Sequence, residues 1–242
     1  MFPISDHNPT LRQPVATYVI IGLNVAAWLL VQGMGREPGL SRSVCELGLI
    51  PGEFLRQLPS GFQIPLGENM ACVVTSGFSW YAPLTSMFLH GSWIHLLGNM
   101  WFLHVFGNNV EDVMGRWRFV AYYLLCGLAA AAAQMLAAPS SPVPMVGASG
   151  AIGGVMGGYV LLYPWARIRT FVFIFFIEVP AIFMLGYWFL LQLAGGSAVN
   201  SDVGGVAFWA HVGGFLAGLI LTPLFRDPQL YAIHRQTTVR VH

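Results

Sequence analysis

The stretch GASGAIGGVMGGYVLLY, residues 147–163, decides the fold, because it is apolar, uncharged and rich in glycine. Small residues recur in it at every fourth position, and the uncharged stretch 203–225 has the same spacing. The two sets are Gly150, Gly154 and Gly158, and Ala210, Gly214 and Gly218. Residues four apart lie on one face of a helix, and faces of small residues let two helices approach closely inside a membrane. We therefore expect two membrane helices that pack along these faces.

The composition of the whole chain also indicates a membrane protein. Of its 242 residues, 56% are hydrophobic and only 9% are charged, whereas soluble domains carry about 25% charged residues. Lipid is therefore the expected solvent for much of the chain. The net charge is +1 and lysine is absent, so no electrostatic argument favours nucleic acid as a partner. The oligomeric state is left open by the sequence.

We predict an all-α, polytopic fold with six membrane spans, each of which needs roughly 20 apolar residues. The predicted spans are residues 16–31, 92–106, 119–138, 149–163, 170–194 and 203–225. The fourth is too short to cross about 30 Å of hydrocarbon at about 1.5 Å per residue. We expect it to begin partway into the bilayer, below an irregular re-entrant segment at the proline-rich residues 139–144.

The positions of arginine give the expected orientation, because cytoplasmic loops carry an excess of basic residues. Arginines precede the first span, follow the sixth, and lie between spans two and three and between spans four and five. Both termini are therefore expected in the cytoplasm. The membrane that we expect is the inner membrane of a bacterial cell. The predicted domains are a cytoplasmic segment (1–15), a membrane domain (16–225) with a long extracytoplasmic loop (32–91), and a cytoplasmic tail (226–242).

Two cysteines of the long loop, Cys45 and Cys72, leave two alternatives open. They can form a disulfide if the loop is extracytoplasmic, or they can be free thiols. Cys126 lies in an apolar run and is expected to be a packing residue.

Two residues suited to nucleophilic chemistry lie near the starts of spans four and six. Ser149 stands between the glycines Gly147 and Gly150 of the fourth span, and His211 is in the sixth. Spans two, four and six run in the same direction, so these starts are expected at a similar depth near the outer face. A serine hydroxyl needs a base, usually histidine, to accept its proton, and an ionisable residue at membrane depth indicates a function. The alternative is that the small residues only pack helices and His211 is a structural histidine.

The second span supplies hydrogen-bond donors. His95 and Asn99 are four residues apart and share one helix face. Acyl transfer creates a negatively charged oxygen that requires preorganised donors, so we expect both side chains and the backbone N–H of Ser149 to form an oxyanion hole. For Asn99 the alternative is an interhelical hydrogen bond. His90, just before this span, is expected to be structural and to tie the loop to the helix.

The histidine is expected to act without an acidic partner. On the sixth span the nearest acidic residue to His211 is Asp202, nine residues away and near the loop. We therefore predict a Ser149–His211 dyad rather than a triad.

Three blocks, in this order along the chain, resemble the signature motifs of rhomboid proteases. They are HGSWIHLLGN at 90–99, GASG at 147–150 and AHVGG at 210–214, and EDVMGR at 111–116 is similar to that family's segment after the second span. The resemblance covers about residues 81–224. It implies hydrolysis of a peptide bond in or near a transmembrane segment of a membrane protein substrate, without metal or cofactor. The roles that it implies are nucleophile for Ser149, base for His211, and oxyanion donors for His95 and Asn99.

Two positions depart from that family's pattern. The arginine that often precedes the second span is missing from WYAP at 80–83, and Gly153 stands where many members have an aromatic residue that stacks on the histidine. His211 is therefore expected to be less well oriented than in those members, or to be supported by another aromatic residue such as Trp209 or Phe208. A rhomboid-like protein that binds membrane clients without cutting them is therefore one alternative. A small transporter with a histidine proton relay is a second, although it would not require glycines around a serine.

The fifth predicted span is the expected gate for substrate entry from lipid. It contains Pro180, which weakens a helix, and a face rich in phenylalanine. Glu178 is expected inside this span and receives no role from the sequence.

Overall fold

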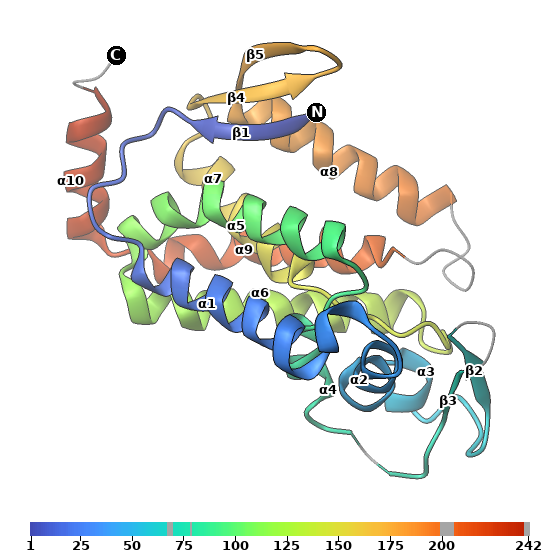
Figure 1. Ribbon diagram of the computed structural model, residues 1–242. Coiled ribbons are helices and arrows are strands. Elements are labelled where there is room, and N and C mark those ends of the chain that lie inside the picture. The colour runs from blue at the N-terminus through green and yellow to red at the C-terminus, as the bar shows by residue number, and fades with distance from the viewer. Residues whose placement is uncertain (67–69, 78, 199–205, 240–242) are drawn as a thin grey trace.

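The computed structural model describes residues 1–66, 70–77, 79–198 and 206–239, and this part of the chain is mostly helical, as predicted (Figure 1). The α-helices are α1 (Val15–Ala26), α2 (Gly39–Leu47), α3 (Pro51–Phe54), α4 (Ala82–Thr85), α5 (Trp93–Met114), α6 (Arg116–Ala137), α7 (Ser149–Leu162), α8 (Ala181–Ala198), α9 (Phe208–Phe225) and α10 (Pro228–Val239). A π-helical turn η1 (Ala27–Val31) continues α1, and η2 (Gly33–Gly35) and η3 (Ser86–Phe88) are 3-10 turns. The strands are β1 (Phe2–Asp6), β2 (Gln63–Pro65), β3 (Ala71–Val73), β4 (Arg167–Val172) and β5 (Phe175–Pro180).

Helix α7 lies at the centre of the bundle. It contacts α5, α6, α8 and α9, and its residues from Gly150 to Tyr159 are all buried. The α6–α7–α9 contact is held by the hydroxyl of Tyr122, which donates to the carbonyl of Gly154 at 2.7 Å and lies 3.0 Å from the hydroxyl of Thr222. Between Gly150 and Tyr159 the helix is enclosed on every side and has no lipid-facing stripe, which explains why its sequence there is apolar all round.

The number of membrane spans stays a prediction. Among the described residues, α6, α8 and α9 are long and apolar enough to cross a membrane, while α7 and the combined α1–η1 helix are shorter apolar helices. Helix α5 has 22 residues and ends at Met114 rather than at the predicted residue 106. The described part of the predicted sixth span begins as a helix at Phe208, and its first residues, 203–205, lie outside the described residues.

The predicted fifth span, 170–194, is wrong in its first half. Strands β4 and β5 form an antiparallel hairpin, and α8 begins only at Ala181, directly after Pro180. The run FVFIFFIEV consists mainly of aromatic and β-branched residues, which favour strands. Glu178 is half-exposed on this hairpin and pairs with Arg167 at 3.7 Å and with His7 at 3.4 Å.

The N-terminal strand β1 completes a three-stranded antiparallel sheet with the order β1-β4-β5. Phe2 lies opposite Phe171 of β4, and its ring stacks on Trp101 of α5 with ring centroids 6.2 Å apart. The indole N–H of Trp101 donates to the carbonyl of Pro3 at 2.7 Å. These contacts hold the first residues against α5, while the sheet lies beside the start of α8 (Figure 1).

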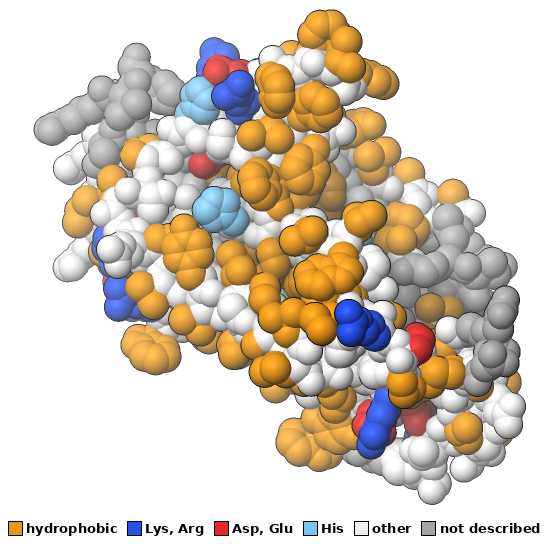
Figure 2. Space-filling view, in the orientation of Figure 1, with side chains coloured by type: hydrophobic (Ala, Val, Ile, Leu, Met, Phe, Trp, Pro, Cys, Tyr) orange, Lys and Arg blue, Asp and Glu red, His pale blue; other side chains and the backbone are white. Residues whose placement is uncertain are grey.

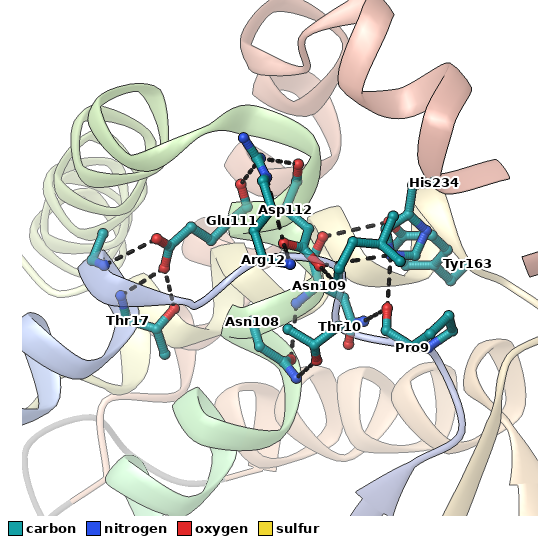
Figure 3. Close-up of polar contacts among 12 residues, drawn as sticks. Pro9, Thr10, Arg12, Thr17, Asn108, Asn109, Glu111, Asp112, Tyr163 and His234 are labelled. Carbon is teal, nitrogen blue, oxygen red and sulfur yellow. Dashed lines mark hydrogen bonds and ion pairs between the residues drawn. The ribbon is translucent and has the colours of Figure 1, made fainter. Parts of the chain in front are cut away.

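A polar network fastens residues 9–17 to the end of α5 (Figure 3). The buried carboxylate of Glu111 accepts the N–H groups of Ala16 (3.0 Å) and Thr17 (2.8 Å) and the Thr17 hydroxyl (2.8 Å). Glu111 therefore caps the first turn of α1, which has no side-chain cap of its own. The neighbouring Asp112 is also buried and accepts the backbone N–H of Arg12 at 3.1 Å.

The loop of residues 32–91 is folded, and within its described residues it contains α2, α3, α4 and the hairpin β2–β3. Cys45 and Cys72 form a disulfide, so the pairing alternative holds and the free-thiol alternative does not. Cys126 is a buried free cysteine, as predicted. Reciprocal backbone hydrogen bonds between Leu49 and Met145 (3.1 and 2.7 Å) join the loop to the segment after α6.

The surface seen in Figure 2 is largely hydrophobic in its middle, and its few charged side chains lie mainly toward the ends. Large exposed apolar side chains occur on every described helix that is long and apolar enough to span a membrane. Examples are Leu136 on α6, Phe183 and Leu190 on α8, and Ile220 and Leu224 on α9. Such a surface suits a hydrocarbon environment.

Candidate active site

Ser149 and His211 lie within hydrogen-bonding distance of each other. Ser149 is the first residue of α7, His211 lies in the first turn of α9, and Ser149 Oγ is 2.8 Å from His211 Nε2. The two residues are 62 positions apart in the sequence, so the contact depends entirely on how α7 and α9 pack.

The glycines explain why the two helices come so close. A Cβ on Gly214 would overlap the carbonyl oxygen of Gly150, and a Cβ on Gly218 would overlap that of Gly154. The backbone of α7 therefore occupies the space where side chains of α9 would stand, as expected for faces of small residues. Ser149 precedes the first of these contacts directly, and His211 is one turn before Gly214.

Gly147 makes room for His95 beside the serine. Its φ of +131° is a conformation that residues with a side chain rarely adopt, and a Cβ there would lie 2.9 Å from the His95 ring and 3.6 Å from Ser149 Oγ. The N–H of Gly147 donates to the carbonyl of Ser86 at 2.9 Å, which fixes the turn that leads into α7.

His95 and Asn99 both present donors near Ser149. The hydroxyl of Ser92 caps α5 by accepting the backbone N–H of His95 at 3.1 Å, and the N–H of Gly91 lies 3.4 Å from His95 Nδ1. Because Nδ1 accepts, the proton of the neutral ring is on Nε2, next to Gly147. The buried Nδ2 of Asn99 has no hydrogen-bond partner among the described residues, so it is a free donor.

Two cavities adjoin these groups. One has a volume of about 210 Å³, and its lining includes His95, Ser149 and His211. The other has a volume of about 300 Å³, and its lining includes all four predicted side chains. A peptide carbonyl placed between the two cavities, next to Ser149, would therefore be within reach of a nucleophile, a base and hydrogen-bond donors.

The side of His211 that faces away from Ser149 contacts two residues that were not among the candidates predicted from the sequence. Nδ1 of His211 is 2.7 Å from Oε1 of Gln192, and the His211 ring lies against Trp188 with centroids 5.8 Å apart. Both residues are on α8. Trp188 thus takes the place that we expected for Trp209 or Phe208, which instead lie against Gly196 and Gly195 near the end of α8. The sequence signal that could have identified Trp188 and Gln192 is their i,i+4 spacing, which places them on one helix face.

Asp202 lies outside the described residues, so the structure does not place the acidic residue nearest to His211 on the sixth span.

His90 is buried and holds the entry to α5. Its N–H donates to Oε1 of Gln32, and its carbonyl accepts from Nε2 of the same side chain, both at 2.7 Å. Its ring packs edge-on against that of His95, with centroids 5.1 Å apart. Burial, reinforced by the neighbouring His95, lowers the pKa of His90 to about 3, so the ring is neutral at physiological pH.

Metal-ligating side chains are dispersed in this structure. Within the described ranges no three His, Cys, Asp or Glu side chains gather closely enough to hold a metal ion. The acidic and histidine side chains of Figure 3 are instead used in hydrogen bonds to backbone groups.

The family model of the Rhomboid domain matches residues 77–228. The chain is 34% identical over 225 residues, 93% of its length, to the rhomboid protease GluP of Bacillus subtilis. It is 29% identical over 59% of its length to the chloroplastic Rhomboid-like protein 11 of Arabidopsis thaliana, and 32% identical over 56% of its length to the mitochondrial Rhomboid protein 1 of Saccharomyces cerevisiae. It spans 37%, 51% and 39% of these three relatives, respectively.

Proposed function

The chain belongs to the rhomboid family, and we propose that it is an intramembrane serine endopeptidase that cleaves transmembrane segments of membrane protein substrates. One observation carries the proposal, which is the 2.8 Å separation of Ser149 Oγ and His211 Nε2 beside a cavity. A packing role alone would not require a hydroxyl and an imidazole to meet next to free hydrogen-bond donors.

In the proposed reaction, His211 Nε2 accepts the proton of Ser149 as Oγ attacks the substrate carbonyl carbon. The tetrahedral intermediate collapses when His211 returns the proton to the leaving amine, and the acyl group remains as an ester on Ser149. Water then attacks that ester, with His211 again as base, and the serine is regenerated. Each step uses side chains of this chain and water.

The negatively charged oxygen of the tetrahedral intermediate would be stabilised by His95, Asn99 and the backbone N–H of Ser149. The free Nδ2 of Asn99 supports this role, because a buried donor without a partner is costly unless a ligand supplies an acceptor. Removal of one such donor costs about 10²–10³-fold in kcat in a well-studied protease.

A rhomboid-like protein that binds membrane clients without cutting them is the second candidate. The observation in its favour is Gly153, since α7 itself offers no aromatic side chain to the His211 ring at that position. Trp188 from α8 contacts this ring instead, which favours the protease.

Cleavage of a transmembrane reporter peptide by the purified protein in liposomes tests the proposal. We expect turnover by the wild type and none by Ser149→Ala or His211→Ala, although both variants keep the wild-type thermal stability within a few degrees. Cleavage by Ser149→Ala at the wild-type rate would refute the assignment of the nucleophile. Absence of cleavage by the wild type, with intact client binding, would favour the second candidate.

The oxyanion role has its own test. Asn99→Ala should lower kcat about 10²-fold while the melting temperature changes little, because the lost donor has no partner in the absence of substrate. A large fall in melting temperature with unchanged kcat would instead indicate an interhelical packing role.

The bilayer and transmembrane substrates are the proposed partners. The Bacillus relative matches more of this chain than the organelle relatives do, which favours a bacterial cell membrane with both termini in the cytoplasm. Protease protection of tags at the two ends of the chain, in spheroplasts of an expressing bacterium, would test the orientation.

A further inference from the structure

The contact between Gln192 and His211 is a short polar interaction at the site that the reaction above does not use. Oε1 of Gln192 lies 2.7 Å from Nδ1 of His211, the ring nitrogen that faces away from Ser149. The other end of the amide is also engaged, because Nε2 of Gln192 donates to the carbonyl of Trp188 at 3.2 Å. The side chain is therefore held at both ends.

These two contacts fix the orientation of the amide. If the amide were rotated by 180°, its oxygen would face the Trp188 carbonyl, and two acceptors would meet without a proton between them. The orientation in the structure gives the NH₂ group an acceptor and leaves the amide oxygen for His211. An amide oxygen can only accept a hydrogen bond, so the proton of the neutral His211 ring must be on Nδ1.

We propose that Gln192 is a positioning residue that holds His211 in its reactive tautomer, which makes the arrangement Ser149–His211–Gln192 in place of a dyad. With the proton on Nδ1, the lone pair of Nε2 points at Ser149 Oγ, 2.8 Å away, ready to accept its proton. The other tautomer would present an N–H to Ser149 and could not act as base. This inference rests on the proposed function, because the tautomer matters only if His211 accepts a proton from Ser149.

Trp188 restrains the same ring on a second side. Trp188 and Gln192 are four residues apart on α8 and therefore share one face of that helix. The Trp188 ring lies against His211 at an interplanar angle of 38°, while Gln192 binds its edge. Helix α8 thus fixes both the direction and the tilt of the imidazole, which α9 alone would leave free to rotate about its side-chain bonds.

A neutral amide suits this position better than a carboxylate would. In soluble triads an aspartate performs the same task, but a buried charge at membrane depth costs several kcal/mol. Gln192 supplies the acceptor without that cost. It therefore fixes the tautomer, but it stabilises the positively charged ring formed during the reaction less than a carboxylate would.

The first test compares three variants on α8. Gln192→Met keeps the length of the side chain and removes the acceptor, Gln192→Glu restores an acceptor oxygen, and Leu191→Met is the matched control on the exposed face of the helix. We expect Gln192→Met to lower kcat about tenfold with unchanged KM, because one hydrogen bond no longer favours the reactive tautomer. Gln192→Glu should recover part of the loss, and Leu191→Met should match the wild type.

The second test observes the proton directly and does not depend on turnover. In protein labelled with ¹⁵N in its histidine rings, the two nitrogens of His211 have different chemical shifts according to which one carries the proton. We expect protonated Nδ1 and unprotonated Nε2 in the wild type, and a mixture of tautomers in Gln192→Met. The His211→Ala spectrum identifies the signals.

The outcomes separate this inference from the proposed function. A wild type that cleaves no substrate but shows a protonated Nδ1 would refute the protease and leave the Gln192–His211 bond standing. A protonated Nε2 in the wild type, or a Gln192→Met variant with the kcat and tautomer of the wild type, would overturn the positioning role even if the protein is a protease.

Discussion

The substitution Gly214→Ala tests whether the approach of α7 and α9 determines activity. The added methyl group would overlap the Gly150 carbonyl oxygen and lie 2.9 Å from its carbon, whereas carbon atoms in contact are usually about 3.5–4.0 Å apart. The helices must therefore separate by about 1 Å. This strain lies one turn from His211 and one residue from Ser149, so their 2.8 Å contact would lengthen to nearly 4 Å, beyond hydrogen-bonding range.

A misplacement of about 1 Å can cost about 10²-fold in rate, and overpacking of a core costs about 1–3 kcal/mol. We therefore expect Gly214→Ala to lower kcat about 10²-fold and to lower the melting temperature by about 2–12 °C, using about 2–4 °C per kcal/mol for a chain of this size. Gly22→Ala in α1 is the matched control, because nothing lies within 4 Å of its added methyl group. Reporter cleavage and thermal unfolding in the same detergent measure both quantities. If Gly214→Ala has the same cleavage rate and the same melting temperature as Gly22→Ala, the glycine faces do not position the site.

Three further predictions concern the frame around the site. Glu111→Ala should destabilise the protein by about 2–4 kcal/mol, because a buried carboxylate that accepts three hydrogen bonds is removed from the start of α1; unfolding in detergent measures this, and an unchanged stability would remove Glu111 as the cap. The stability should fall by about 2 kcal/mol from pH 6.5 to pH 5 because of His90, since its pKa is lowered to about 3 and the unfolded chain takes up the proton first; a pH dependence unaltered in His90→Phe would contradict this. Cys72→Ser should make the loop of residues 32–91 sensitive to proteolysis while the bundle resists, because the substitution removes a disulfide that links positions 27 apart. If the wild-type loop resists proteolysis equally under reducing and oxidising conditions, the disulfide does not have that role.

The parts of the fold and site that could be predicted from the sequence depend on residue types that have few structural interpretations. Glycines at four-residue spacing are hard to explain except by close helix contact, and the contact that they predicted is the one between α7 and α9. The disulfide could not be decided from the sequence, because it depends on whether the folded loop brings Cys45 to Cys72.

The hairpin at residues 167–180 was missed because an apolar run shows no periodicity that separates a buried strand from a helix. The aromatic and β-branched composition of the run, and Pro180 directly before the first residue of a helix, were the available signals. Gln192 and Trp188 were missed for a related reason. Helix α8 is apolar nearly all round, so the sequence does not reveal which of its faces meets α9.

The enclosure of α7 by four neighbours has a consequence for biogenesis. A segment of 14 residues with this much glycine is too short to cross a bilayer unaided. It would also gain little free energy by moving into lipid without its neighbours. We therefore expect it to enter lipid together with the flanking hydrophobic segments. Mutations that weaken α6 or α9 would therefore first reduce the yield of inserted protein, before any effect on a mature molecule can be measured.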